Sequence, residues 1–145
     1  MYKHILSPTD GSELSMHAVD VGVGLARTCD AKIHAIHVLA PFAAMLHCTE
    51  IAQIPEATHT AQVIAKARQI LGQVRQRAKM DGTPFEAEFL FAPQPANASV
   101  ELAATPGCDL IVMGSHGRGG LHRLLLGSQT CKVVQQGDLP VRVCK

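Results

Sequence analysis

Segments patterned as strands and segments patterned as helices alternate along this chain from one end to the other. Short apolar runs typical of buried strands occupy residues 2–7, 31–39, 85–91, 109–113 and 141–144. Between them, apolar residues recur at helical spacing in residues 12–28, from 55 or 56 to the Asp81-Gly82 turn, in 96–105 and in 128–136. This alternation predicts parallel βαβ units with right-handed crossovers, and therefore a three-layer α/β sandwich.

The connections between these segments contain signals of their own. Asp10 and Ser12 are both candidates for the N-cap of the first helix, and Gly137 is the candidate C-cap of the last. The longest connection, residues 40–55, contains two prolines and no clear periodicity. Because long connections in compact domains are usually functional, we expect a lid or a binding loop there.

The chain has the size and composition of one globular domain spanning residues 1–145. Of its residues 47% are apolar and 17% charged, and no internal repeat is visible. No apolar run approaches the roughly 18 residues of a membrane span, and Met1 leads directly into a strand-like segment rather than a secretory signal. We expect a soluble, cytoplasmic protein whose five cysteines are reduced, since none of them forms a C-x-x-C pair.

Charge and aromatic content argue against a nucleic-acid partner. The formal net charge is +1, and lysines and arginines are scattered rather than clustered. Aromatic residues make up 3% of the chain and tryptophan is absent, so no platform for stacking bases is visible.

The stretch from Gly114 to Thr130, GSHGRGGLHRLLLGSQT, connects a predicted strand to a predicted helix. Glycines let a ligand approach the backbone closely, and the first N–H groups of a helix have no partner within it. Such a connection predicts an anion site, above all for a nucleotide phosphate. Ligands of open parallel sheets bind beyond the carboxyl ends of the strands, where the strand order reverses. If the first and fourth strands are neighbours, the 8–11 turn, Val38 and the Gly114 stretch share one crevice.

Two familiar phosphate loops are excluded by the residues present. A Walker A loop needs G-x-x-x-x-G-K-[ST], and the chain has no Gly-Lys pair. A dinucleotide fingerprint starting at Gly117 needs glycine at position 122, where His122 stands, and it belongs after the first strand rather than the fourth. The spacing that is present is G-x2-G-x9-G-S, formed by Gly114, Gly117, Gly127 and Ser128.

In this spacing the chain resembles the universal stress protein family, whose nucleotide-binding members have G-x2-G-x9-G-[ST] after the fourth strand. The segments PTDGS at 8–12, HVL at 37–39, DLIVMGSHGRGG at 109–120 and LPV at 139–141 are all similar to that family. The resemblance spans essentially the whole chain. It implies a five-stranded parallel sheet of order 3-2-1-4-5, in the Rossmann-like fold of adenine nucleotide alpha hydrolases, and a homodimer formed through the last strand, residues 141–144.

The same resemblance implies that ATP, or another adenine nucleotide, binds in the crevice together with Mg²⁺. Asp10 would hold the ribose or a metal–phosphate group, and the backbone of Val38 would contact adenine. The glycines of the motif and Ser128 would hold the phosphates. The whole expected site comprises Pro8, Thr9, Asp10, Val38, Met113, Gly114, Ser115, His116, Gly117, Arg118, Gly127, Ser128, Gln129 and Thr130.

The residue types at the end of the motif agree with a phosphate site. Gly127 and Ser128 open the last predicted helix, so its first N–H groups are donors at the positive end of the helix dipole. The hydroxyls of Ser128 and Thr130 add two further donors. Arg118, His122 and Arg123 lie between the second and third glycines, where they are placed to neutralise outer phosphates.

The eight histidines favour no metal site of their own. His34 and His37 are three residues apart in a predicted strand, so they point to opposite faces and do not chelate one ion together. His47 and Cys48 have no partners at metal-ligand spacing. Any metal is expected to be Mg²⁺ carried by the nucleotide, with Asp10 as the protein carboxylate.

Binding without fast turnover is the more economical interpretation of the site. Hydrolysis of ATP needs a group that positions water and groups that stabilise developing charge. His116 is the candidate for the first, but no lysine lies in the glycine stretch and no second carboxylate accompanies Asp10. We expect an ATP-binding stress-response regulator in which nucleotide occupancy tunes the dimer or partner state. A slow ATPase or nucleotide-transfer enzyme using His116, and a structural dimer with an empty crevice, remain open alternatives.

Overall fold

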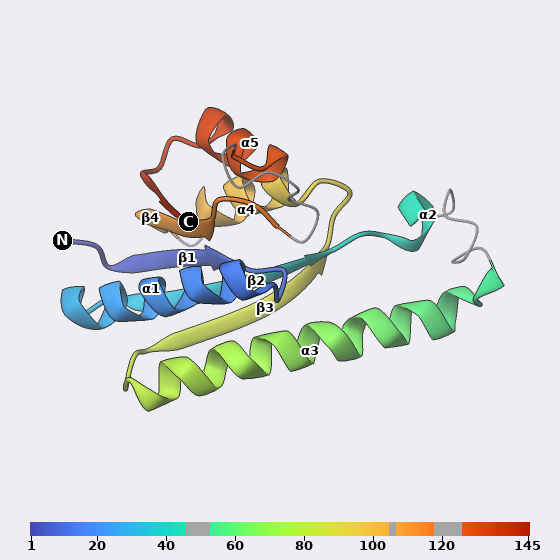
Figure 1. Cartoon of the computed structure of the whole chain (residues 1–145), viewed down its shortest axis with the longest axis horizontal. Helices are drawn as coiled ribbons and strands as arrows, with labels where there is room; N and C mark the ends of the chain where they lie inside the picture. The colour runs from blue at the N-terminus through green and yellow to red at the C-terminus, as the bar shows by residue number, and fades with distance from the viewer. Residues whose placement is uncertain (46–52, 105–106, 118–125) are drawn as a thin grey trace.

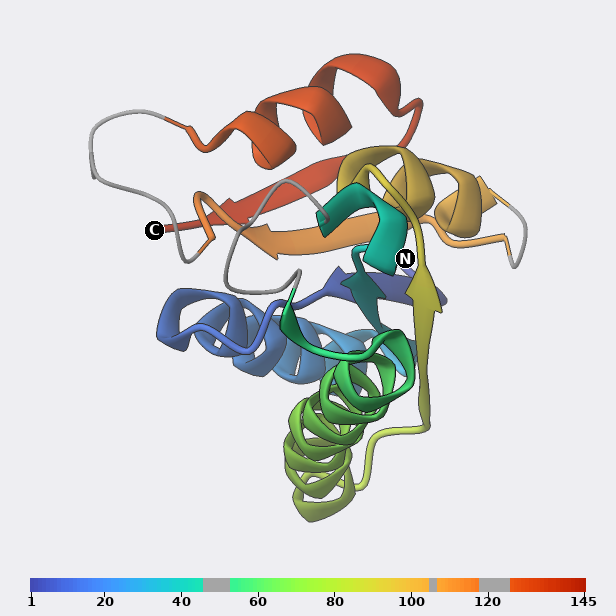
Figure 2. The same cartoon turned by 90° about the vertical axis from the view of Figure 1, so that its right-hand side faces the viewer.

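The computed structural model describes residues 1–45, 53–104, 107–117 and 126–145. Its elements are β1 (His4–Pro8), α1 (Glu13–Cys29), β2 (Lys32–Leu39), α2 (Phe42–Met45), α3 (Glu56–Met80), β3 (Phe85–Phe91), α4 (Pro95–Ala104), β4 (Leu110–Gly114), α5 (Ser128–Gln136) and β5 (Val141–Cys144). The strands are parallel and pair in the order β3-β2-β1-β4-β5. α1 and α3 cover one face of the sheet, and α4 and α5 cover the other (Figure 1, Figure 2). The expected three-layer sandwich and its strand order are confirmed.

Local sequence determines the residues at which α1 begins and α5 ends. Ser12 is the N-cap of α1, because its hydroxyl accepts the N–H of Ser15 at 3.3 Å. Asp10, the other candidate, instead accepts the N–H of Ser12 at 2.9 Å within its own turn. Gly137 ends α5 as predicted, and a Cβ at this position would lie 2.9 Å from the carbonyl oxygen of Val133. Steric exclusion of a side chain therefore requires glycine there.

The predicted bounds of β3, α5 and β5 are confirmed, and most of the other predicted elements are shifted by one or two residues. The element that the sequence did not predict is α2, a single turn within the 40–55 connection. The ring of Phe42 in this turn contacts that of His59 in α3, with 5.4 Å between their centroids. One turn is too short to show a helical period. Residues 46–52 of the expected lid lie outside the described part of the chain.

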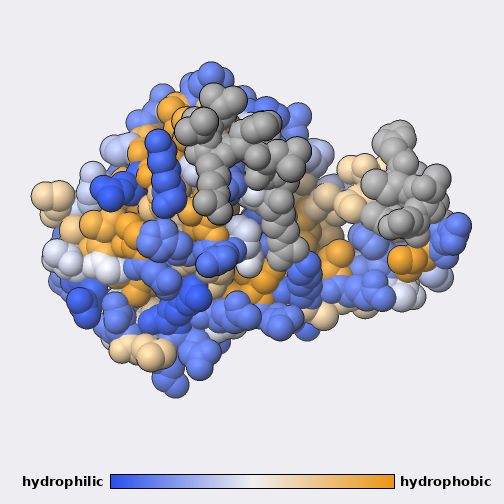
Figure 3. All heavy atoms as spheres, viewed as in Figure 1, coloured by the Kyte–Doolittle hydropathy of each residue, from blue (hydrophilic) through white to orange (hydrophobic). Residues whose placement is uncertain are grey.

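Alternate residues of the strands form two cores, one on each face of the sheet. Those facing α1 and α3 include Ile5, Ile33 and Val112, and those facing α4 and α5 include Leu6, Ile36 and Ile111. Gly22 lets α1 approach the sheet, since a Cβ there would lie 3.1 Å from Cδ1 of Ile33. The outer surface of α3 is mostly hydrophilic (Figure 3), as expected of a helix that buries one stripe. None of the helices in the described ranges is long and apolar enough to cross a bilayer.

The cysteines of the described residues are free thiols, as predicted. These are Cys29, Cys108, Cys131 and Cys144, whereas Cys48 lies outside the described part of the chain. Burial raises the pKa of the Cys108 thiol to about 11. Burial also raises the pKa of Cys144. Both thiols are therefore uncharged at neutral pH.

Candidate functional site

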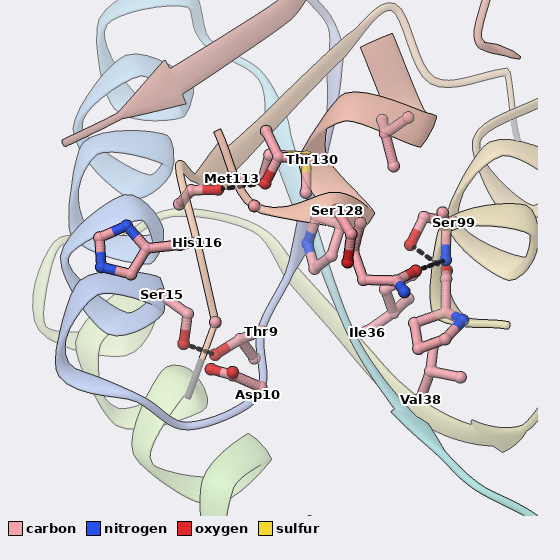
Figure 4. Close-up of a pocket in the computed structure, with 18 residues that line it drawn as sticks. Thr9, Asp10, Ser15, Ile36, Val38, Ser99, Met113, His116, Ser128 and Thr130 are labelled. Atoms are coloured by element: carbon pink, nitrogen blue, oxygen red, sulfur yellow. Dashed lines mark hydrogen bonds between the residues drawn. The ribbon is translucent and has the colours of Figure 1, made fainter. Parts of the chain in front are cut away.

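A cavity of about 420 Å³ opens at the edge of the sheet where the parallel strands have their carboxyl ends. β1, β2 and β4 end at this cavity, and the N-terminal turns of α1, α4 and α5 also line it (Figure 4). Its lining residues are Pro8, Thr9, Asp10, Ser15, Ile36, Val38, Pro95, Ala96, Ser99, Met113, Gly114, His116, Gly117, Gly127, Ser128, Gln129, Thr130 and Val133. Small-molecule sites usually have volumes of about 300–1,000 Å³. The cavity lies at the predicted place, because β1 and β4 are neighbours.

All but two of the residues expected from the sequence line this cavity. Ser115 is buried outside the lining. Its N–H donates to the carbonyl of Cys144 at 2.7 Å, and its own carbonyl accepts the N–H of Gly127 at 2.6 Å. Arg118 lies outside the described residues, as do His122 and Arg123. Ser115 therefore connects the two glycine segments to β5 instead of lining the cavity.

The turn after β1 is held in place by hydrogen bonds. The carbonyl of Thr9 accepts the Nδ1–H of His37 at 2.7 Å. The hydroxyl of Thr9 pairs with that of Ser15 at 2.9 Å and accepts the N–H of Gly11 at 3.1 Å. Gly11 has a φ of +80°, which glycine adopts without strain. Asp10 thus lies at the cavity on a turn whose neighbours are fixed by hydrogen bonds.

The N-terminus of α5 contributes its first three residues to the cavity. Gly127 is the N-cap and has no side chain with which to satisfy the first N–H groups. The Thr130 hydroxyl donates to the carbonyl of Gly114 at 2.9 Å, so it is not the additional ligand donor that the sequence suggested. Ser128, which is exposed, is the one remaining hydroxyl of the predicted pair.

Two glycines of the motif occupy places where a side chain does not fit. A Cβ at Gly117 would lie 2.7 Å from Oδ2 of Asp10. A Cβ at Gly127 would lie 3.0 Å from Cα of His116 and 3.2 Å from the carbonyl oxygen of Ser115. Both positions are thus close-packed, and larger residues would force the segments apart. At Gly117 and Gly127, therefore, the chain exposes backbone atoms rather than a side chain to the cavity.

The sequence did not predict the wall formed by α4. Pro95, Ala96 and Ser99, from the first two turns of this helix, all line the cavity. The side-chain oxygen of Gln129 accepts the N–H of Ala96 at 3.1 Å, so α5 also supplies a cap for α4. The other missed lining residues are Ser15, Ile36 and Val133. These missed residues come together through tertiary packing. The one local signal in the sequence was Pro95, a proline at the start of a helix, which indicates where α4 begins.

Asp10 is the one Asp, Glu, Lys or Arg that lines the cavity within the described residues. Among the described lining residues, N–H groups are therefore the donors available to an anion, whereas Arg118, His122 and Arg123 lie outside the described part of the chain. The remaining titratable lining residue is His116. Its Nδ1 lies 3.1 Å from Oγ of Ser115, and its ring is turned away from Ser128 and Val38 (Figure 4).

The two histidines of β2 have different partners on different parts of the sheet. His37 donates to the Thr9 carbonyl beside the cavity, whereas the Nε2–H of His34 donates to Oε1 of Glu88 at 2.9 Å. His47 and Cys48 lie outside the described residues. At the cavity, Asp10 is the single carboxylate available to a nucleotide-bound cation within the described lining.

Comparison with known sequences places the whole chain in one family. The profile of the Universal stress protein family matches residues 1–145. Universal stress protein MJ0531 of Methanocaldococcus jannaschii is 35% identical, over 100% of this chain and 83% of that protein. Universal stress protein YxiE of Bacillus subtilis is 31% identical, over 100% of both chains.

Solved structures agree with this placement. Universal stress protein MJ0577 of Methanocaldococcus jannaschii superposes with a TM-score of 0.84 at 27% identity, over 100% of this chain and 96% of that chain. A universal stress protein in complex with cAMP superposes with a TM-score of 0.71 at 27% identity, over 98% of this chain and 95% of that chain. The sequence matches and the shared Rossmann-like fold together show that the chain belongs to the universal stress protein family.

Proposed function

We propose that this protein binds ATP, with Mg²⁺, in the cavity and acts as a nucleotide-dependent regulator rather than an efficient enzyme. The main support is the N-terminus of α5, which has no side-chain cap and lies beside two glycines where a Cβ does not fit. Uncapped N–H groups at the positive end of a helix dipole suit a phosphate. The relative solved with cAMP supports an adenine nucleotide as the ligand.

β2 supplies the base-binding half of the proposed site. The carbonyl of Ile36 accepts the N–H of Thr9 at 2.9 Å, so the backbone groups of Ile36 point toward β1. Residues two apart in a strand present their backbone groups to the same neighbour. Val38 therefore directs its N–H and C=O toward β1, which has already ended at Pro8. These groups are placed to pair with the polar edge of adenine.

The glycine segments and α5 form the phosphate half. The bare backbone at Gly117 and Gly127 allows close approach, and the first N–H groups of α5 are the donors. Mg²⁺, with Asp10 as its carboxylate, would offset phosphate charge, and Arg118, which the sequence assigns to the site, would add a cationic side chain. The orientation of His116, with its ring turned away from Ser128 (Figure 4), favours binding over turnover.

Protein purified without added nucleotide is expected to contain an adenine nucleotide that denaturation releases and ion-pair chromatography identifies. Calorimetry on the stripped protein should show one ATP per chain, with weaker binding once EDTA removes Mg²⁺. AMP and cAMP test the need for the outer phosphates, and GTP is the control for the base. If no nucleotide copurifies and ATP does not bind at millimolar concentration, the proposal fails and the empty structural module is the better description.

β5 is the sheet edge through which we propose a homodimer. The N–H groups of Ile111 and Ser115 donate to the carbonyls of Pro140 and Cys144 at 3.0 and 2.7 Å. The even-numbered residues of this segment therefore face β4, and Val141 and Val143 present their backbone groups to the free edge. An uncovered edge strand is an association site.

Val143→Pro is expected to convert the dimer to a monomer while the fold is kept. Proline removes an N–H from the free edge and none from the β4 ladder. Light scattering after size-exclusion chromatography measures the mass, and circular dichroism checks the fold. Val143→Thr keeps the N–H and the β-branched shape, so this control should remain dimeric. A monomeric parent protein at high concentration, or a dimeric Val143→Pro variant, would contradict the proposed edge.

A further inference from the structure

Three buried side chains with metal-binding atoms meet at the edge of the sheet opposite the cavity. They are His4 at the start of β1, His34 in β2, and Cys108 shortly before β4. Their ligand atoms lie within 4.8 Å of one another, and the residues are 6%, 5% and 6% exposed. The strands begin at this edge, whereas Asp10 and Gly114 lie where β1 and β4 end. The cluster is therefore separate from the proposed nucleotide site.

A carboxylate orients His34 within the cluster. The Nε2–H of this imidazole donates to Oε1 of Glu88 at 2.9 Å, whereas its buried Nδ1 has no hydrogen-bond partner among the described residues. Histidines that bind a metal usually donate one ring N–H to a carboxylate or carbonyl and offer the other nitrogen to the ion. A buried polar atom without a partner is uncommon in a native core. A bound cation would give Nδ1 of His34 the partner that it lacks.

Hydrogen bonds through Asp109 hold the start of β1, which contains His4, against the segment before β4, which contains Cys108. The Asp109 carboxylate accepts the N–H of Lys3 at 2.7 Å and that of His4 at 3.2 Å. The N–H of Asp109 donates in turn to the carbonyl of His4 at 2.9 Å. Cys108 is fixed at the end of α4, because its N–H donates to the carbonyl of Ala103 at 3.0 Å. The ligand positions are therefore set by backbone contacts as well as by packing.

We propose that His4, His34 and Cys108 bind Zn²⁺. Two imidazoles and a thiolate are typical zinc ligands, whereas Mg²⁺ and Ca²⁺ take oxygen ligands. Metal–ligand distances of about 2.0–2.3 Å require ligand atoms about 3.3–3.8 Å apart in a tetrahedron, so small side-chain movements close the present spacing. On binding, the Cys108 thiol releases its proton to solvent. Three protein ligands leave the fourth position of the zinc to water.

The competing interpretation is a metal-free polar cluster. The rings of His4 and His34 are stacked, with 5.7 Å between centroids and 14° between planes. Stacking contributes packing energy, but it provides no hydrogen-bond partner for Nδ1 of His34. A zinc site explains why Glu88 orients His34, why Nδ1 of His34 has no partner, and why the Cys108 thiol lies beside it. This proposal does not depend on nucleotide binding.

The test uses the full chain without an affinity tag or nucleotide, stripped with EDTA and dialysed. Titration with Zn²⁺ against a chromophoric chelator should show one zinc per chain. Co²⁺ should give the near-ultraviolet absorption of a cobalt–thiolate bond. Cys108→Ser should lose this band and weaken zinc binding by more than about 100-fold. Glu88→Gln should keep the band and weaken binding by about 10–100-fold, because it perturbs the orientation of His34 only.

Cys144→Ser is the matched control, since Cys144 is also buried at 6% exposure but lies in β5, outside the cluster. This variant should keep both the zinc stoichiometry and the cobalt band. Circular dichroism of each metal-free variant establishes that the fold is kept. Failure of the parent protein to bind zinc would overturn the proposal. Unchanged zinc affinity in Cys108→Ser, or a cobalt–thiolate band that survives this substitution, would overturn it as well.

Discussion

ATP affinity is expected to fall by about 10- to 100-fold when Gly117 is replaced by valine. The new Cβ would lie 2.7 Å from Oδ2 of Asp10, so it displaces the carboxylate and occupies space beside the phosphate segment. Overpacking of this kind costs about 1–3 kcal/mol, and each 1.4 kcal/mol changes affinity tenfold. Calorimetry with ATP and Mg²⁺ measures the loss directly.

Gly72→Val is the control for this substitution. Gly72 lies on the exposed side of α3, remote from the cavity lining, and a Cβ added there would meet no atom within 4 Å. The same chemical change there should leave ATP affinity unaltered. If Gly117→Val binds ATP as tightly as the parent protein while its circular dichroism is native, the assignment of this segment to the phosphates is wrong.

Ile5→Ala is expected to lower the free energy of unfolding by about 2–5 kcal/mol. Ile5 is 0% exposed and lies in the central strand β1, where it is paired with Ile33 of β2 and Leu110 of β4. Truncation leaves a cavity between the sheet and α1 that close-packed neighbours fill only in part. Urea unfolding followed by circular dichroism gives the change in free energy.

The comparison for this experiment is Val134→Ala on α5. Val134 is 47% exposed, and surface substitutions usually change stability by no more than about 0.5 kcal/mol. The two variants together separate loss of core packing from a general effect of removing methyl groups. Equal stability losses for Ile5→Ala and Val134→Ala would contradict the position of β1 at the centre of the core.

Elements with a long or regular pattern were predictable from the sequence. The alternation in Phe85–Phe91 identifies β3, and the glycine-bounded segment Ser128–Gln136 identifies α5. α2 was not predictable, because it is a single turn without a period. Of the two N-cap candidates for α1, choosing Ser12 over Asp10 needed the observed hydrogen bonds, since both residue types suit the position.

The candidate site was predictable where its residues share one sequence motif. Gly114, Gly117, Gly127 and Ser128 follow a fixed spacing, and all four line the cavity. The residues of α4 line the cavity because this helix packs against α5, and no local sequence pattern predicts that packing. The histidine–cysteine cluster was missed for the same reason. Its members come from three distant segments, so the neighbours of His34 in the cluster lie far from it in the sequence.

The peptide groups on either side of Ser115 join the sheet edge at β5 to the phosphate half of the cavity. The N–H of Ser115 donates a hydrogen bond to the carbonyl of Cys144 at the end of β5, and its carbonyl accepts the N–H of Gly127, the N-cap of α5. A ligand that shifts Ser115 changes both bonds at once. If β5 forms the dimer, thermodynamic reciprocity requires subunit association to tighten nucleotide binding by the same factor by which nucleotide tightens association. The affinity for nucleotide is then expected to depend on the concentration of the protein, which sets the fraction that is dimeric.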